Sequence, residues 1–162
     1  MNIIQEGAEV RSYNKDIVED VKFYVERINK TMVTLNYNMS PKKDLVDTHM
    51  YIKYDGWTDG KWVRNEVIDF DFPFCDMYTD GDLNIFKPCM TDGVRGNFPE
   101  ECPNDGTTLL KQTYFIKECY LDESVSLQLF LPGRWRVNVD FFTGDGVEIC
   151  HLYLYMNCIE IP

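Results

Sequence analysis

The stretch Arg134-Trp135-Arg136-Val137-Asn138-Val139-Asp140-Phe141 decides the fold, because polar and apolar side chains alternate at every position. Successive side chains of a β-strand point to opposite faces of its sheet, so this pattern predicts a strand with one buried and one solvated face. The same alternation occurs over residues 31–39 and 125–131. Three such segments favour an all-β fold.

Weaker strand signals occupy further segments, which are separated by Asp-Gly and other turn residues. Glycine and aspartate tolerate the backbone of a tight hairpin at Gly144-Asp145-Gly146, so we expect residues 134–142 to pair with residues 148–158. The spacing favours a two-sheet β-sandwich or β-cup of about eight strands. The weaker strands are expected at residues 20–28, 46–54, 61–70, 112–121 and 148–161.

Two further regions depart from the alternating pattern. Residues 149–156 are apolar or aromatic on both faces, which is typical of a strand covered on two sides, so we expect this strand inside a sheet. Residues 75–105 contain five Gly or Pro residues between Gly81 and Pro99 and no sustained period. We interpret them as a disulfide-stapled loop region, with a short helix near 76–86.

Length and charge narrow the classes of function. The 162 residues fit one domain, residues 1–162, and the 44% hydrophobic content supplies a core. A formal net charge of −11 without a Lys/Arg-rich stretch disfavours nucleic acid as a partner. No run approaches the roughly 20 apolar residues of a membrane helix, and Met1 to Arg11 lacks the apolar middle of a signal peptide. We expect the numbering to begin at the mature end of a secreted chain.

The cysteines support secretion. The chain has six cysteines, with no C-x-x-C pair and no histidine at zinc spacing, so disulfides are favoured over a metal site. Six cysteines allow 15 connectivities, and spacing does not choose among them. Asn29-Lys30-Thr31 is a predicted N-glycosylation site, whereas Pro41 follows directly after the second sequon, Asn38-Met39-Ser40, and disfavours its use.

Motifs of catalysis are missing from the sequence. His49 and His151, the two histidines, lie in no triad motif, and the chain has no G-x-S-x-G elbow, phosphate-binding glycine loop or H-E-x-x-H. The acidic run from Asp76 to Asn84 resembles a calcium loop, but Ile85 occupies the place where an EF-hand needs glycine. We therefore expect no enzyme, no metal and no cofactor.

The apolar strand residues leave two interpretations open. They fill the core of an ordinary sandwich, or they line an apolar cavity in a cup whose sheets splay apart. Periodicity does not separate the two.

A resemblance favours the cup. The segments that carry it are Phe74-Cys75-Asp76-Met77, Pro88-Cys89, Asn97-Phe98-Pro99-Glu100-Glu101-Cys102-Pro103 with Gly106, and Leu131-Pro132-Gly133-Arg134-Trp135-Arg136-Val137. Over roughly residues 70–160 the chain resembles the insect CheA/CheB chemosensory group, secreted proteins similar to the ganglioside-activator branch of the ML lipid-recognition domains. The resemblance implies a β-cup of two sheets around a lipid cavity.

The resemblance also implies disulfides. It pairs Cys75 with Cys102, and it leaves Cys89 without its usual partner, because Glu100 stands at that position. Cys89 must then pair elsewhere or stay free. For Cys119 we favour Cys150 or Cys158 as the partner.

The resulting hypothesis is a secreted, non-enzymatic domain that binds and carries or presents a lipid or pheromone-like ligand, with a receptor or enzyme as a further partner. The alternative is an extracellular interaction domain with a filled core. The predicted cavity residues are Val33, Leu35, Tyr37, Leu127, Leu129, Trp135, Val137, Val139, Leu152 and Leu154.

Overall fold

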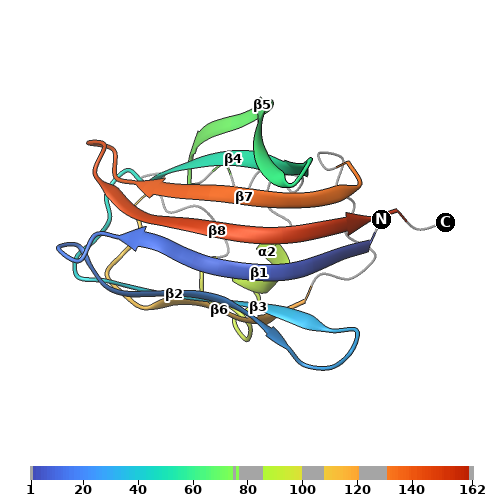
Figure 1. Cartoon of the computed structure of the whole chain (residues 1–162). Helices are drawn as coiled ribbons and strands as arrows, with labels where there is room; N and C mark the ends of the chain where they lie inside the picture. Colours follow the sequence, from blue (N-terminus) through green and yellow to red (C-terminus); the bar gives the residue numbers. More distant parts are fainter. Residues whose placement is uncertain (1, 75, 77–85, 100–107, 121–130, 161–162) are drawn as a thin grey trace.

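A computed structural model describes residues 2–74, 76, 86–99, 108–120 and 131–160, and it is an all-β molecule of two antiparallel sheets (Figure 1). The larger sheet has five strands in the order β1-β8-β7-β4-β5. Their bounds are β1 Asn2–Tyr13, β8 Glu148–Ile159, β7 Gly133–Phe142, β4 His49–Thr58 and β5 Lys61–Pro73.

Among the described residues the smaller sheet has three strands in the order β2-β3-β6, and the short helix α2 packs against β6. The bounds are β2 Val18–Arg27, β3 Val33–Pro41, β6 Tyr114–Cys119 and α2 Lys87–Met90. The all-β prediction and the two-sheet arrangement are confirmed.

The predicted β7–β8 hairpin is confirmed, with Val137 opposite Leu154 and Val139 opposite Leu152. Gly146 has a φ of 83°, a conformation that glycine adopts without steric cost. Strand β8 lies between β1 and β7, so the two-sided apolar segment is inside a sheet as expected. Its inward side chains are buried and its outward tyrosines are half-buried.

Strand β1 was not predicted. Its alternation is interrupted by register shifts between Gln5 and Gly7 and between Val10 and Ser12, and a polar side chain occupies the buried position 5. A β-bulge breaks the period of two that sequence patterns rely on. Residues 125–130 of the strand expected at 125–131 lie outside the described residues, and Leu131 is exposed and belongs to no strand. Most of the helix expected near 76–86 also lies outside the described residues, and α2 begins at Lys87.

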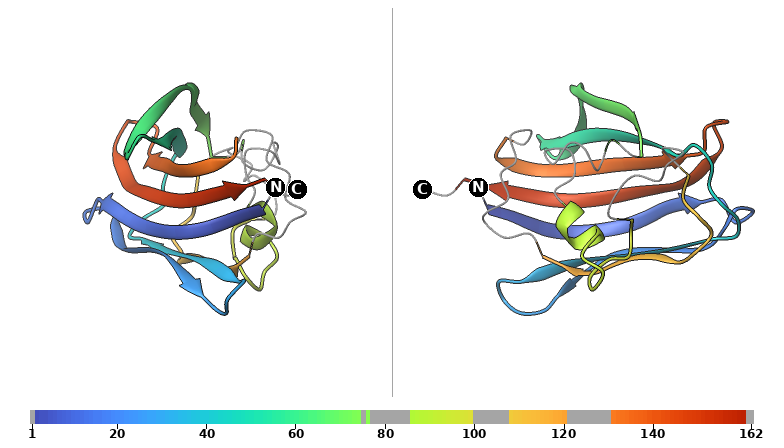
Figure 2. Two further views of the ribbon diagram at one scale, coloured as in Figure 1. Left: turned by 45° about the vertical axis from the view of Figure 1, so that its right-hand side comes forward. Right: turned by 180° about the vertical axis from the view of Figure 1, so that it is seen from behind.

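The two sheets approach each other closely on one side. Backbone contacts between the sheets run from β1 to β2 and β3 and from β8 to β2, whereas β4, β5 and β7 make no comparable backbone approach to the described strands of the smaller sheet. In Figure 2 the larger sheet curls from β5 down to β1, where β2 continues the wall. The buried apolar side chains of the two sheets form one hydrophobic cluster.

An aromatic bridge joins the sheets on the side away from the β1–β2 contact. Phe74 lies 5.5 Å from Phe141 of β7 and 6.0 Å from Phe98, measured between ring centroids. Phe98 in turn lies 5.2 Å from Tyr114 of β6 and 6.4 Å from Tyr37 of β3. Aromatic pairs at such separations are favourable beyond their burial, so this chain of rings holds the two sheets together.

The disulfides differ from the expectation. Cys89 of α2 is bonded to Cys119 of β6, while Cys150 and Cys158 are buried free thiols. The pairing favoured for Cys119, with Cys150 or Cys158, is therefore wrong. Cys119 belongs to the smaller sheet, where α2 packs against β6. The predicted Cys75–Cys102 bridge lies outside the described residues.

Cys150 and Cys158 also lie too far apart to bond each other. Both lie on the inward face of β8, eight residues apart. A strand advances about 3.3 Å per residue, which separates them by roughly 26 Å, whereas disulfide-bonded cysteines have Cα atoms within about 7 Å.

Candidate functional site

The predicted cavity residues that the structure describes belong to the inward faces of the two sheets. Six are buried members of one hydrophobic cluster: Leu35, Tyr37, Trp135, Val137, Leu152 and Leu154. Val139 is partly buried and packs against that cluster, and Val33 is also partly buried. Leu127 and Leu129 lie outside the described part of the chain. The residues that the sequence pattern selected on β3, β7 and β8 therefore share one apolar inward face.

The polar groups of this surface are uncharged at neutral pH. The Tyr37 hydroxyl donates to Sδ of Met39 at 3.2 Å, and burial raises the pKa of Tyr37 well above its ordinary value. Burial likewise raises the pKa of the Cys150 thiol to about 12 and that of the Cys158 thiol to about 11. The inward face therefore offers neutral hydroxyl and thiol groups beside its apolar side chains.

Gln5 is a buried polar residue of β1, whereas Ile3, Ala8, Val10 and Tyr13 of the same strand belong to or pack against the hydrophobic cluster. Its side chain is 3% exposed and lies beside Met156 in the sheet register. The Nε2 atom donates across the interior to the carbonyl oxygens of Val33 and Cys119, at 3.4 and 3.5 Å. Its Oε1 atom is buried and has no hydrogen-bond partner. The sequence analysis did not identify Gln5. The feature that could have identified it is a glutamine at an inward position of an amphipathic segment.

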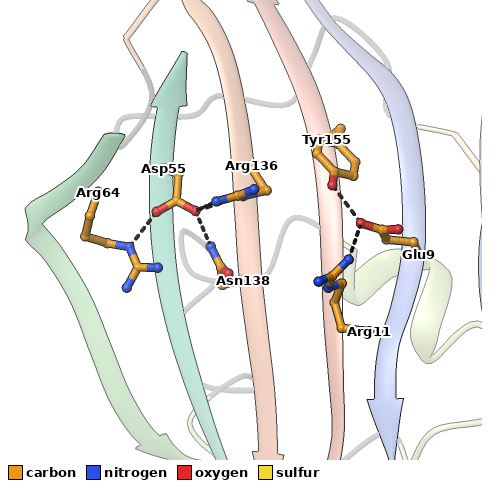
Figure 3. A network of polar contacts seen from close by, with 7 residues as sticks. All are labelled: Glu9, Arg11, Asp55, Arg64, Arg136, Asn138 and Tyr155. Atoms are coloured by element: carbon orange, nitrogen blue, oxygen red, sulfur yellow. Dashed lines mark hydrogen bonds and ion pairs between the residues drawn. The ribbon is translucent and has the colours of Figure 1, made fainter. Parts of the chain in front are cut away.

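The outward face of the larger sheet centres on Asp55 of β4 (Figure 3). The Asp55 carboxylate is 2% exposed and accepts from Arg64, from Arg136 Nε at 2.9 Å and from Asn138 Nδ2 at 2.8 Å. Burial alone would raise the pKa of Asp55, but the hydrogen bonds from Arg64, Asn138 and Arg136 outweigh it and lower that pKa. The carboxylate therefore stays ionised and joins β4, β5 and β7.

Arginine and aromatic side chains alternate across the same face. Tyr153 lies between Arg11 and Arg136, whose guanidinium carbons are 4.9 and 4.7 Å from its ring centroid. Arg136 also lies 5.2 Å from the Trp62 ring, and Arg134 lies 5.8 Å from the Trp57 ring. Such cation–π contacts are attractive, so this face cross-links β1, β8, β7, β4 and β5 by side chains alone.

Both histidines lie on this outward face. His151 Nδ1 is 3.8 Å from Asp140 Oδ1, which is too long for a hydrogen bond. His49 Nε2 is 3.4 Å from Asp47 Oδ1. Within the described ranges, no group of three or more His, Cys, Asp or Glu side chains is arranged to hold a metal ion.

Asn29, the predicted glycosylation site, is exposed in the turn between β2 and β3. Its Oδ1 atom accepts hydrogen bonds from the Thr31 backbone N–H at 2.9 Å and the Thr31 hydroxyl at 3.0 Å. The sequon is therefore on the surface, with its threonine hydroxyl beside the asparagine. No helix in the described residues is long and apolar enough to cross a membrane.

The chain matches no model of a known protein family and no curated protein.

Proposed function

We propose that the protein is a secreted carrier that binds a lipid or pheromone-like small molecule on the concave apolar face between its two sheets, with no covalent step. The resemblance gives chemosensation as the setting, with a receptor or enzyme as the partner to which the ligand is presented.

The observation that supports the proposal most strongly is the distribution of side chains on the two sheets. Leu35 and Tyr37 on the smaller sheet belong to the same hydrophobic cluster as Val137 and Leu154 on the larger one. The two backbones approach closely only on the β1–β2 side of the described strands. Ligand sites are typically concave and apolar with a few placed polar groups, and this face has that composition.

Burial of apolar surface supplies the affinity. Each methylene removed from water contributes about 0.8 kcal/mol, which is roughly a fourfold change in affinity. Association costs about 4–15 kcal/mol in lost freedom, so short chains bind weakly and long chains bind well. We expect affinity to rise about fourfold per added methylene until the chain exceeds the available length.

The test has two parts, both on the natively purified protein. Organic extraction followed by mass spectrometry is expected to release a bound lipid. Displacement of a fluorescent alkyl probe by a series of straight-chain alcohols is expected to show the fourfold steps. Absence of any extracted lipid together with absence of probe uptake would leave the alternative, a filled sandwich that docks a receptor.

Secretion is supported by the Cys89–Cys119 disulfide and by the exposed Asn29 sequon, because disulfides persist mainly in oxidising compartments. Expression in eukaryotic secretory cells is expected to give a glycosylated product whose added mass is lost in Asn29→Gln and kept in Asn38→Gln. A product of unmodified mass in the medium would contradict the use of Asn29.

A further inference from the structure

We propose that the bound molecule is uncharged and carries a hydroxyl or other hydrogen-bond donor, which donates to Oε1 of Gln5. The ligand class is then a long-chain alcohol or related neutral lipid, in preference to a fatty acid or a plain hydrocarbon. This inference rests on the proposed function and adds the polar end of the ligand to it.

The hydrogen bonds of Gln5 show which atom of its amide is free. Nε2 faces the carbonyl oxygens of Val33 and Cys119 at 3.4 and 3.5 Å. A reversed amide would place Oε1 against both carbonyls and repel them, so the hydrogen bonds assign the nitrogen to that side. The free atom is therefore an acceptor, and only a donor satisfies it.

The Gln5 side chain is buried, with 3% of its surface exposed, and its Oε1 atom has no hydrogen-bond partner. Buried polar atoms in folded proteins are almost always hydrogen-bonded, and an unpaired one is costly. The Gln5 amide reaches from β1 to the backbone carbonyls of Val33 and Cys119 on the smaller sheet, so it lies between the two sheets. A ligand hydroxyl meets this requirement.

The buried polar residues decide whether a charged ligand would find a partner between the sheets. The buried polar residues in the described part of the chain are Gln5, Thr34, Asn36, Thr48, Asp55 and Asn138. The strand alternation places Thr34, Asn36 and Asn138 on outward faces, and Asp55 is bound by two arginines on the outward face. None of the six is a lysine or an arginine, so no buried cation faces inward in the described part of the chain. A carboxylate in this apolar interior would stay unpaired, which is strongly unfavourable.

The experiment compares four ligands of equal chain length in a probe-displacement assay: an alcohol, its methyl ether, the alkane and the carboxylic acid. Wild-type protein is expected to bind the alcohol about tenfold more tightly than the ether, which lacks the donor. Affinity for the acid is expected to fall about tenfold per pH unit above about pH 5, because only the neutral form enters.

The Gln5→Met variant keeps the length of the side chain and removes the acceptor. It is expected to bind alcohol and ether equally, while Asn157→Met, on the outward face of β8, keeps the tenfold preference. Equal binding of alcohol and ether by the wild type, or an unchanged preference in Gln5→Met, would overturn the inference and leave the proposed function standing. Binding of none of the four ligands would overturn both. If Gln5→Met does not fold, the wild-type comparison of alcohol with ether still decides.

Discussion

The two faces of the five-stranded sheet use the same strands for different purposes. On β7 and β8 the inward residues Val137 and Leu154 are apolar, while the outward residues Arg136 and Tyr153 contact each other. On the outward face the Asp55 carboxylate is satisfied by Arg64, Arg136 and Asn138, whereas Asp140 Oδ1 is buried without a hydrogen-bond partner. The inward face has apolar side chains and, at Gln5, a buried acceptor without a partner.

We therefore assign a structural role to the outward face and the proposed ligand binding to the inward face. The Asp55 network is paired within the sheet, so it holds β4, β5 and β7 together without a further partner. In the proposed function, the apolar inward face with the unpaired Oε1 of Gln5 is the face that receives the ligand. Substitutions confined to one face of the sheet test whether the two faces have these separate roles.

The largest effect is expected from Asp55→Ala on the outward face. Removing a buried carboxylate leaves Arg64 and Arg136 without their shared acceptor, and the free energy of unfolding is expected to fall by about 3 kcal/mol in urea denaturation. The control is Glu6→Ala, which removes the more exposed pair with Arg134 and is expected to cost at most about 1 kcal/mol. Ligand affinity of the folded Asp55→Ala protein should be unchanged. Equal losses in both variants would contradict the assignment.

The same network predicts a pH dependence. Because the pKa of Asp55 is lowered in the folded state, its ionised form stabilises the protein above the unfolded value of about 3.9, and this contribution is lost as the pH falls through the lowered pKa. The stability difference between wild type and Asp55→Ala is therefore expected to shrink below about pH 4. A difference that grows on acidification would be inconsistent with an ionised Asp55.

A smaller change in stability is expected from Val139→Phe on the inward face. In a filled core, the larger ring costs about 1–3 kcal/mol by overpacking. In a cup, the ring occupies ligand space, so we expect a loss below about 1 kcal/mol together with loss of probe binding. Val67→Phe, at a position 92% exposed on β5, is the matched control and should change neither property. A loss of about 1–3 kcal/mol in Val139→Phe together with unchanged probe binding would favour the filled sandwich.

The smallest expected effect concerns the free thiols. Cys150 and Cys158 are buried, and burial raises the pKa of each well above neutrality, so alkylation of the native protein should leave both unmodified. Peptide mapping after denaturation without reduction should find both alkylated and Cys89 linked to Cys119. Rapid labelling of either thiol in the native protein would contradict its burial.

Much of the fold was predictable from the sequence, because the alternation in β3 and β7 depends only on local periodicity. Strand β1 was not, since its bulges break that periodicity. The outward network was missed because Asp55 meets Arg136 only through the β4–β7 register, which no local pattern encodes. The Cys89–Cys119 bond depends on where α2 packs against β6, and the unpaired state of Gln5 depends on three strands together.

If an apolar molecule lies against the inward face, the three tryptophans report its position directly. Trp135 belongs to the inward cluster, whereas Trp57 and Trp62 contact arginines on the outward face. The measurement is quenching of tryptophan fluorescence by a terminally brominated long-chain alcohol, with the unbrominated alcohol as reference. Quenching is expected in the Trp57→Phe/Trp62→Phe variant, which keeps Trp135, and not in Trp135→Phe. Quenching confined to Trp135→Phe, or absent from both variants, would contradict the account.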